Sequence, residues 1–581
     1  MVAETGMRCQ SAASMSPPSF THSRLRYHAS TCGLLTLLCL ALYLPGLTTI
    51  PPVDRDEPRF AQATKQMVET GDFVRPRFQA DDRFNKPIGI YWLQAAAVYA
   101  TRQADGRAIW VYRLPSVLGA YAAVLLTYWI GCALFDRSRA FLAAAFLASS
   151  ALLVVEAHFA TTDAVLLACV IAAQGCLASL YVAAQRGEPG HARHAAGFWL
   201  AQGLGILIKG PIVPLVSSLT VGALLLVDRP IATRMLAGLR AAWGVALMLA
   251  PVLPWAVAVG LATDGAFYHG WFGGDVLPKI TGGHELHGAP PGTYLLLLPA
   301  TFWPASFAVG LGIVRGLRGG DGSAERFCLA WVMPTWLFFE MMPTKLPNYV
   351  LPTFPALALL VAAAVSDLAV SGSCSSRRIV RIGFALWGAL TLAAGVAIIA
   401  AARLLGAGVD FSVAGCALAA AVTSFVCVQQ CWTGNLVRAS WIAVTGSVAL
   451  FAPVLQWVLP DLHALWLSPA AVAAIAQTSG GAGTRPVVAV GYYEPSLIFL
   501  AGTNIALAEP TRAVNFLDER SNGLVLVSDD QQAEFMRAAS DMRVQVREVW
   551  GGSGVNYSKG ERTRLHLFEH SPPPPAARTF E

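Results

Sequence analysis

The stretch of sequence that decides the fold runs from Cys32 to Pro76 and reads "CGLLTLLCLALYLPGLTTIPPVDRDEPRFAQATKQMVETGDFVRP". Its first part is almost entirely apolar and approaches the roughly 20 residues that a helix needs to cross a bilayer. Its second part, from Val53 onward, is crowded with acidic and basic residues. The stretch therefore predicts a membrane-crossing helix that is followed directly by a charged segment at the boundary between lipid and water.

The whole chain has the composition of a membrane protein. Of its 581 residues, 55% are hydrophobic and 13% are charged, whereas soluble domains carry about a quarter charged residues. The apolar run that begins at Cys32 lacks the small-residue cleavage site of a signal peptide, so we interpret it as a retained first helix. These features predict a polytopic α-helical membrane protein.

Hydropathy predicts thirteen spans between Cys32 and about Pro460, and the distribution of arginine tests this count. Short cytoplasmic loops are rich in Arg and Lys. If the N-terminus lies inside, every even-numbered gap between the spans carries arginine, from Arg137 and Arg139 to Arg438. The predicted spans are 32–50, 111–135, 140–157, 164–184, 196–208, 211–227, 241–261, 293–314, 327–342, 349–370, 382–402, 412–430 and 441–459.

The odd-numbered gaps, which then face outward, collect a different chemistry. Besides the charged stretch after the first span, they are "FNKP" (84–87), "HFATTD" (158–163), "IKGP" (208–211), "GGHELHG" (282–288) and "TKLPNY" (344–349). Any one of these loops alone is better explained as a solvated turn. The six segments lie on one side of the membrane, whereas the other side carries mostly arginine. Together they predict a composite site at the outer face.

The charged stretch itself predicts a helix from Glu57 to Thr70, with Pro58 in its first turn and Gly71 at its end. Apolar residues fall on one stripe of this helix, so it can lie on the membrane surface with that stripe toward the lipid. A second apolar run, "PIGIYWLQAAAVYA" (87–100), is short for a span and predicts another interfacial helix that starts beside Lys86.

Three stretches resemble one family of membrane enzymes. "DRDEPRFAQATKQMVETGDFVRPRF" followed by "FNKPIGIYWLQ", together with "GLGILIKGPIVPL" (203–215) and "KLPNYVLP" (345–352), is similar to the lipid A aminoarabinose transferase (ArnT) family and its relatives, the protein O-mannosyltransferases. The resemblance covers roughly the first 370 residues. It implies a C-type glycosyltransferase fold and the transfer of a sugar, on the outer side of the membrane, from a polyprenyl phosphate to a lipid or protein acceptor.

The residues fit this chemistry. A sugar on a polyprenyl phosphate already carries a good leaving group, so the enzyme needs a carboxylate to take the acceptor's proton and cations to hold the phosphate. The resemblance makes Asp56 the candidate base, with Glu57 and Asp163 as acids that orient the other groups. It makes Arg59, Lys86, Lys345 and Tyr349 candidates for binding the phosphate. For Arg59 and Lys86, snorkelling toward the interface is the competing interpretation.

The chain departs from the family before the Lys-Pro pair, where aminoarabinose transferases commonly have an acid and this chain has Asn85. Since Asn is a poor zinc ligand, the departure weakens the case for a bound metal and for aminoarabinose as the sugar. A divalent metal stays open, but no cofactor is firmly implied and no residue is assigned as a metal ligand. We interpret the Gly-flanked loop with His284, Glu285 and His287 as a lid or acceptor loop.

The last part of the chain is soluble in character. Short β-type runs (486–491, 523–528, 544–550 and 564–570) alternate with helix-like segments, which predicts a small α/β domain with a disordered Pro-rich end. The predicted organisation is a cytoplasmic segment (1–31), a transmembrane glycosyltransferase domain (32–460) with an outer loop (51–110), and an extracytoplasmic α/β domain (461–581).

The sequence therefore predicts a pentosyl- or hexosyltransferase of the bacterial inner membrane with its active face in the periplasm. Its expected partners are a polyprenyl-phosphate-linked sugar, a lipid A-like or other cell-envelope acceptor and membrane lipids, but not nucleic acid. The alternative is a transporter or flippase of lipid-linked sugars. Transporters place ionisable groups near the bilayer midplane, whereas the predicted spans are nearly free of charge. A noncatalytic scaffold ranks last because it leaves the outer acids and lysines without a role.

Overall fold

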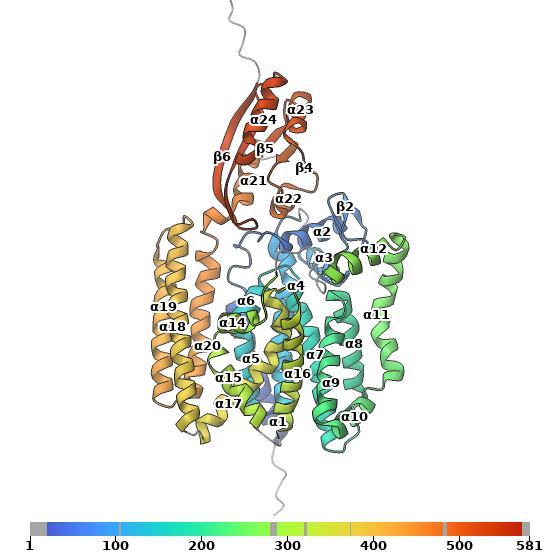
Figure 1. Cartoon of the computed structure of the whole chain (residues 1–581), viewed down its shortest axis with the longest axis vertical. Helices are drawn as coiled ribbons and strands as arrows, with labels where there is room; N and C mark the ends of the chain where they lie inside the picture. The colour runs from blue at the N-terminus through green and yellow to red at the C-terminus, as the bar shows by residue number, and fades with distance from the viewer. Residues whose placement is uncertain are drawn as a thin grey trace, which may run out of the picture.

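The computed structural model describes residues 20–103, 106–278, 288–318, 322–371, 374–479 and 485–571. It consists of a thick layer of roughly parallel helices with a smaller α/β domain standing on one end of that layer (Figure 1). Three predictions fall outside the described residues: most of the N-terminal segment, the loop with His284, Glu285 and His287, and the Pro-rich end. The polytopic helical architecture with a C-terminal α/β domain is confirmed.

The long helices of the layer follow the predicted spans closely. By length and apolarity, seven of the described helices could cross a membrane, or eight if a pair bent by 60° counts as one span. The other predicted spans coincide with helices that are shorter, less apolar or broken, so the count of thirteen stays a prediction. The main helices are α1 (Phe20–Tyr43), α4 (Ile109–Leu134), α5 (Arg137–Ser149), α6 (Ala151–Ala157), α7 (Asp163–Gln185), α8 (Ala192–Lys209), α9 (Ile212–Val227), α11 (Ala241–Ala262), α16 (Ser323–Met341), α17 (Phe354–Ser371), α18 (Cys374–Leu404), α19 (Phe411–Trp432) and α20 (Leu436–Pro453).

Several predicted spans have the wrong limits: α18, for example, begins at Cys374 rather than at residue 382. The first helix, α1, ends at Tyr43 rather than at residue 50, because Pro45 and Gly46 follow it. Gly46 adopts a φ of 83°, and a Cβ atom there would lie 2.5 Å from the carbonyl oxygen of Leu455, so only glycine fits. The predicted span 293–314 is broken into α14 (Thr293–Thr301), a short 3-10 helix (Ala305–Ala308) and α15 (Val309–Arg318). Pro304, which has no amide hydrogen to donate, lies at the break.

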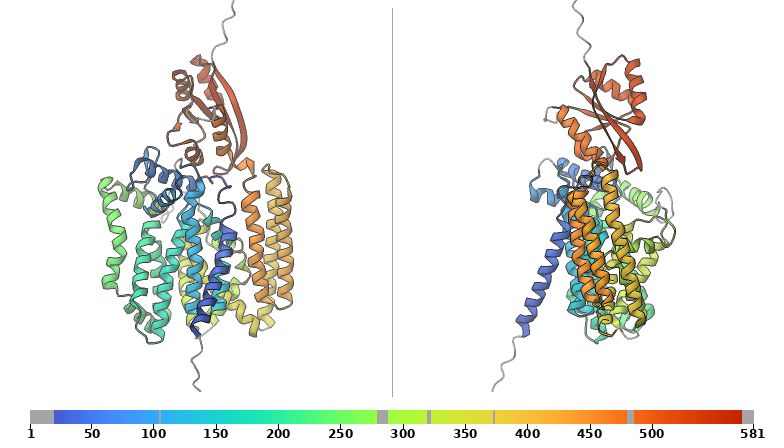
Figure 2. Two further views of the ribbon diagram at one scale, coloured as in Figure 1. Left: turned by 180° about the vertical axis from the view of Figure 1, so that it is seen from behind. Right: turned by 90° about the vertical axis from the view of Figure 1, so that its left-hand side faces the viewer.

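The two predicted short helices are present, but the predicted contact of the apolar stripe of the first one with lipid is wrong. Helices α2 (Asp56–Thr70) and α3 (Gly89–Thr101) lie across the ends of the long helices, between the layer and the α/β domain (Figures 1 and 2). Phe60, Ala63 and Met67 of α2 are buried against other parts of the protein, in one cluster with Tyr91 and Leu207, because neighbouring helices cover this stripe. Gly71 ends α2 in the left-handed conformation with a φ of 73°, and its amide donates to the carbonyl of Met67. The charged stretch therefore forms a platform at one end of the layer.

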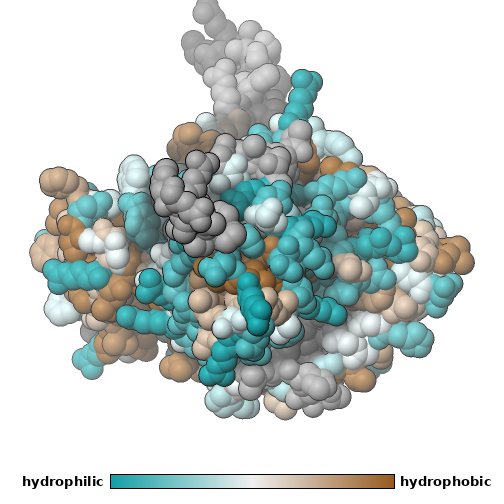
Figure 3. Space-filling view, turned by 90° about the horizontal axis from the view of Figure 1, so that it is seen from above, coloured by the Kyte–Doolittle hydropathy of each residue, from teal (hydrophilic) through white to brown (hydrophobic). Residues whose placement is uncertain are grey.

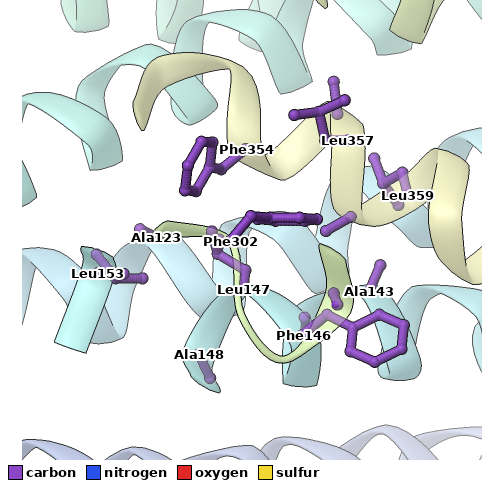
Figure 4. Packing of buried hydrophobic residues seen from close by; sticks show 14 of the residues in the cluster. Ala123, Ala143, Phe146, Leu147, Ala148, Leu153, Phe302, Phe354, Leu357 and Leu359 are labelled. Carbon is purple, nitrogen blue, oxygen red and sulfur yellow. The ribbon is translucent and has the colours of Figure 1, made fainter. Parts of the chain in front are cut away.

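The interior of the layer is packed with aromatic and small residues. Phe302 and Phe354 are fully buried and meet edge to face with their ring centres 4.9 Å apart (Figure 4). Ala143 and Ala148 of α5 are also fully buried, and their small side chains allow neighbouring helices to approach closely. This close packing gives the platform a rigid base.

The α/β domain is built on a five-stranded sheet in the order β4-β3-β5-β7-β6. Leu524 and Leu526 of β5 belong to one buried cluster and Val525 and Val527 to another, so both faces of the sheet are covered. The predicted strands are confirmed, whereas α21, α23 and β4 were not predicted. The elements are α21 (Leu467–Thr478), β3 (Val487–Val490), α22 (Pro495–Ala501), β4 (Ala506–Leu507), α23 (Pro510–Glu519), β5 (Leu524–Ser528), α24 (Asp529–Asp541), β6 (Val546–Asn556) and β7 (Glu561–His570).

The end of the molecule that carries the α/β domain is polar. Seen from above, hydrophilic side chains cover much of this face, and many of the hydrophobic side chains lie toward its rim (Figure 3). This distribution agrees with a layer of helices whose lipid-facing sides are apolar and whose domain-bearing end meets water.

Candidate active site

Five of the six predicted outer segments meet around one polar cavity of about 360 Å³ beneath the α/β domain. The sixth segment lies almost wholly outside the described residues, but its last residue, Gly288, forms a β-bridge with Thr344. The predicted composite site at one end of the layer therefore has a structural counterpart. The cavity is lined by residues 53–57, Arg59, Phe60, Arg83, Asn85, Lys86, Glu156, Phe159, residues 161–163, Lys209 and residues 346–349.

A second cavity, of about 470 Å³ and mostly apolar, adjoins the first. Its walls come chiefly from α9, α16 and the turn at the start of α17, with Leu215, Phe338 and Met342 among them. Both cavities are lined by Lys86, Asp163, Lys209, Asn348 and Tyr349. Charged and aromatic side chains thus stand where a polar space joins an apolar one.

Asp163 and Lys209 form an ion pair at this junction. The Oδ1 atom of Asp163 accepts from the Nζ atom of Lys209 at 2.6 Å, and the side chains are 9% and 15% exposed. Asp163 is the first residue of α7, where a carboxylate is favoured by the helix dipole, and Lys209 is the last residue of α8, where a cation is favoured. The ammonium also lies 5.7 Å from the ring centre of Tyr349.

Asp56 and Arg59 occupy the first turn of α2 and line the polar cavity. Their charged groups are 4.0 Å apart, and their side chains are 62% and 45% exposed, so this contact is loose. The preceding residue, Arg55, has a φ of 84° and a ψ of −100°, a costly conformation for a residue with a side chain. Asp56 thus combines an accessible carboxylate with a strained backbone next to it.

Glu57, the next residue, has a different environment. It forms a salt bridge with Arg113, which donates from Nε to Oε1 at 2.7 Å and from Nη2 to Oε2 at 2.9 Å. The amides of Val53 and Ala160 donate to the same carboxylate. Arg113 also donates to the carbonyls of Leu47, Ile50 and Pro51. Since the pair is buried and its hydrogen-bonding capacity is used, Glu57 ties the charged segment to α4.

Asp54 is hydrogen-bonded to the α/β domain. Its Oδ1 accepts from the Ser496 amide at 2.8 Å and its Oδ2 accepts from the Ser496 hydroxyl at 2.7 Å. Burial raises the pKa of the Asp54 carboxyl to about 7, although the hydrogen bonds from Ser496 act to lower it. The three consecutive acids at positions 54, 56 and 57 therefore have three different sets of partners.

The predicted phosphate-binding residues do not all reach the cavities. Lys86 lines both cavities, and its Nζ donates to the carbonyl of Asn85 at 2.9 Å. Lys345 is buried, and its Nζ donates to the carbonyl of Met342 at 2.6 Å. It lines neither cavity, whereas Tyr349 lines both.

Sequence reasoning missed three charged residues at the site. Arg83 and Glu156 line the polar cavity, and the Arg83 guanidinium stacks 5.0 Å from the ring centre of Phe60. Arg113 holds Glu57. Arg113 and Glu156 lie within predicted spans, and an ionisable residue at such a position is a recognised signal of a structural or functional role.

The described residues do not supply an evident metal site. No group of three or more His, Cys, Asp or Glu side chains in the described ranges is arranged to hold an ion. Of the five acids that line the polar cavity, Asp163 pairs with Lys209, Glu57 pairs with Arg113, and Asp54 accepts from Ser496. Glu156 accepts from the Thr161 hydroxyl, and Asp56 is in loose contact with Arg59. Since three of the five carboxylates are engaged by strong donors, we derive no step through a metal.

Comparison with known proteins shows which sequences this chain is similar to. A family described as dolichyl-phosphate-mannose-protein mannosyltransferase matches residues 85–255. The undecaprenyl phosphate-α-4-amino-4-deoxy-L-arabinose arabinosyl transferase of Aeromonas salmonicida is 32% identical over 351 residues, which cover 58% of this chain and 60% of the relative. The corresponding enzyme of Yersinia enterocolitica is 26% identical over 344 residues, with coverages of 58% and 60%. The matched region thus spans about 60% of the length of these relatives.

Solved structures extend the likeness to nearly the whole chain. The crystal structure of ArnT from Cupriavidus metallidurans bound to undecaprenyl phosphate has a TM-score of 0.67 at 20% identity and covers 94% of this chain and 98% of that one. An archaeal oligosaccharyltransferase, AglB of Archaeoglobus fulgidus in complex with an inhibitory peptide and a dolichol-phosphate, has a TM-score of 0.51 at 12% identity, with coverages of 94% and 74%. The resemblance inferred from three short stretches is therefore confirmed: the chain has the ArnT fold, and more than half of it is similar in sequence to the aminoarabinose transferases.

Proposed function

We propose that this protein is a membrane glycosyltransferase that moves a sugar from a polyprenyl phosphate to a lipid A-like acceptor. The observation that carries the proposal is the junction of the polar and apolar cavities, which share Lys86, Asp163, Lys209, Asn348 and Tyr349. A donor of this class has a long apolar chain, a charged phosphate and a polar sugar in sequence. Its three parts correspond to the apolar cavity, the shared residues and the polar cavity.

In this proposal the phosphate binds at the shared residues. Lys86 and Lys209 supply cations, and charge-assisted hydrogen bonds to phosphate are the strong ones. The polyprenyl chain follows the apolar walls formed by residues such as Leu215 and Phe338. The sugar then projects into the polar cavity, toward the start of α2.

The proposed reaction is a displacement at the anomeric carbon. The Asp56 carboxylate takes the proton of an acceptor hydroxyl, the acceptor oxygen forms a bond to the anomeric carbon, and the bond from that carbon to the phosphate oxygen breaks. The electron pair leaves with the phosphate, whose added charge Lys86 and Lys209 stabilise. Asp163 orients the Lys209 ammonium, and Glu57 anchors the segment that carries Asp56.

For the sugar we propose 4-amino-4-deoxy-L-arabinose, the sugar in the names of the sequence relatives. Asn85 stands in this chain where those enzymes commonly have an acid, so other pentoses and hexoses belong in the same experiment. The α/β domain and the polar cavity lie at the same end of the helix layer (Figure 1). We propose that this end faces the periplasm of a bacterial inner membrane.

The test is transfer by the purified full-length protein in detergent micelles. Undecaprenyl phosphate carrying aminoarabinose, another pentose or a hexose is mixed with lipid A, and the products are identified by mass spectrometry. The proposal expects glycosylated lipid A and free undecaprenyl phosphate in equal amounts. The alternative function, a flippase, moves lipid-linked sugars between the two leaflets of a membrane. It would form no glycosylated lipid A in detergent micelles. If the protein consumes none of these donors, the proposal is wrong.

A further inference from the structure

The α/β domain is docked on α2, the helix that begins with Asp56. Helix α22 of that domain lies directly above α2 (Figure 1). Phe499 of α22 is fully buried, and its ring centre lies 5.5 Å from that of Tyr112 in α4. Near the far end of α2, the Thr503 hydroxyl contacts the side chains of Gln62 and Glu69 at 2.9 Å each. The contact therefore runs along most of the helix.

Just before the start of α2, residues of the α/β domain form hydrogen bonds to Asp54. Ser496 holds the Asp54 carboxylate through its amide and its hydroxyl, at 2.8 and 2.7 Å. The Ser496 hydroxyl oxygen also lies 2.6 Å from that of Ser468, which contacts the hydroxyl of Tyr492 at 3.0 Å. Ser496, Ser468 and Tyr492 are all buried residues of the α/β domain. Asp54 is thereby fixed to the domain rather than to the membrane layer.

The turn between β6 and β7 holds the other side of the same segment. The Asp54 amide donates to the Tyr557 hydroxyl at 2.7 Å, and Nη2 of Arg55 donates to the carbonyl of Ser558 at 2.5 Å. Two separate elements of the α/β domain thus hold two consecutive residues immediately before Asp56.

Arg55 is the residue with the strained backbone, at a φ of 84°. A non-glycine residue keeps such a conformation only where its neighbours over-determine it. On one side of it, Asp54 is held by Ser496 and Tyr557. On the other side, Glu57 is held by Arg113. Asp56 lies between these anchors, so its direction depends on both of them.

We infer that the α/β domain is a positioning part of the candidate active site, and that Ser496 and Tyr557 act through the strained segment 54–55 to aim Asp56 into the polar cavity. The inference rests on the proposed function, because it assigns Asp56 to the reaction. It gives the domain a role that no motif within the domain reveals. Ser496 and Tyr557 are positioning residues, since neither lines the polar cavity.

The test compares Ser496→Ala and Tyr557→Phe with Tyr493→Phe in the full-length protein. Tyr493 is a matched control because it is exposed and its hydroxyl donates within the domain, to the carbonyl of Ala508. A misplacement of about 1 Å can cost roughly 10²-fold in rate. We expect Ser496→Ala and Tyr557→Phe to lower kcat about 10- to 100-fold with donor KM unchanged within about twofold, and Tyr493→Phe to match the wild type.

A second measurement separates this inference from the proposed function. Hydrogen exchange of the amides at residues 53–60 should be faster in both variants than in the wild type and in Tyr493→Phe, whether or not any sugar is transferred. If the wild-type protein transfers no sugar, the proposed function is wrong, but the hydrogen-exchange comparison can still be made. An active wild type with unchanged kcat in both variants, or unchanged exchange at these amides, would overturn the inference.

Discussion

The Oδ1 atom of Asp163 lies 2.6 Å from the Nζ atom of Lys209, at the junction of the polar and apolar cavities. The two residues are 46 positions apart and begin and end different helices. The pair keeps a cation at a partly buried position beside an apolar space, where an isolated ammonium would be costly. In the proposed function, this pair lies where the phosphate of the donor binds.

Donor binding should depend on Lys86 and Lys209. Replacing either by Ala removes a charge-assisted hydrogen bond of about 1.5–3 kcal/mol, so we expect the Kd for undecaprenyl phosphate to rise roughly 10- to 150-fold. The measurement is binding of undecaprenyl phosphate to purified protein in micelles. Lys345→Ala is the matched control, because its ammonium contacts the Met342 carbonyl and lines neither cavity. If Lys345→Ala weakens the binding of undecaprenyl phosphate as much as the other two substitutions do, Lys345 is also a phosphate ligand.

Turnover should depend on Asp56. The Asp56→Asn substitution keeps the size of the side chain but removes the proton acceptor, so kcat is expected to fall about 10²–10⁴-fold with less effect on donor binding. Asp81→Asn is a suitable control, because Asp81 is an exposed acid of the same outer segment that does not line the polar cavity. If the Asp56→Asn variant has the kcat of the wild type, Asp56 is not the base and another acid takes the proton.

The Glu57–Arg113 pair should matter for stability. Both side chains are almost completely buried, and removing one partner of a buried ion pair leaves an uncompensated charge at a cost of about 3–5 kcal/mol. We expect Arg113→Ala to lower the thermal unfolding temperature in detergent by several degrees. The exposed Arg77–Asp82 pair, 3.4 Å apart, provides the comparison, since Arg77→Ala should cost about 0–1 kcal/mol. Equal shifts in the two variants would contradict this assignment.

Stability should fall as the pH rises through the titration of Asp54. Burial raises the pKa of this carboxyl to about 7, so the folded protein binds its proton more tightly than the unfolded chain does. The stability that this group contributes is complete below the unfolded pKa of about 4 and is lost as the pH approaches and passes 7. Between pH 5 and pH 8, the Tm of Asp54→Asn should therefore fall less than that of the wild type. A parallel decline in both proteins would show that Asp54 is not the group involved.

The orientation in the membrane can be tested by cysteine labelling. Single cysteines at Ser553 of β6 and at Thr433, between α19 and α20, are introduced into a Cys-free background; both positions are exposed. A membrane-impermeant thiol reagent should label position 553 in intact spheroplasts and should label position 433 only after lysis. The expectation follows from the α/β domain standing at the end opposite the loop that holds Thr433 (Figure 1). The reverse result would put the candidate active site in the cytoplasm.

Several features could be predicted from the sequence because they depend on residues close together in the chain. Apolar runs become helices in lipid, since every backbone polar group must be satisfied within its own segment. Helix α2 was predicted to within one residue at its start, because Pro58 and Gly71 act locally on the backbone. The limits of α1 and the break at Pro304 were missed, although both have local causes.

Only the tertiary structure decided which charges belong together. Glu57 and Asp56 are neighbours in the sequence, but consecutive side chains on a helix point about 100° apart, so Glu57 is buried against Arg113 while Asp56 stays exposed. Asp54 meets Ser496, 442 residues away, because the α/β domain folds back onto α2. The sequence by itself determined the membrane helices, the two short helices of the platform and the types of residue at the site. Packing between distant segments determined which carboxylate is buried, which is paired and which is accessible, because burial and pairing depend on neighbours that the local sequence does not specify.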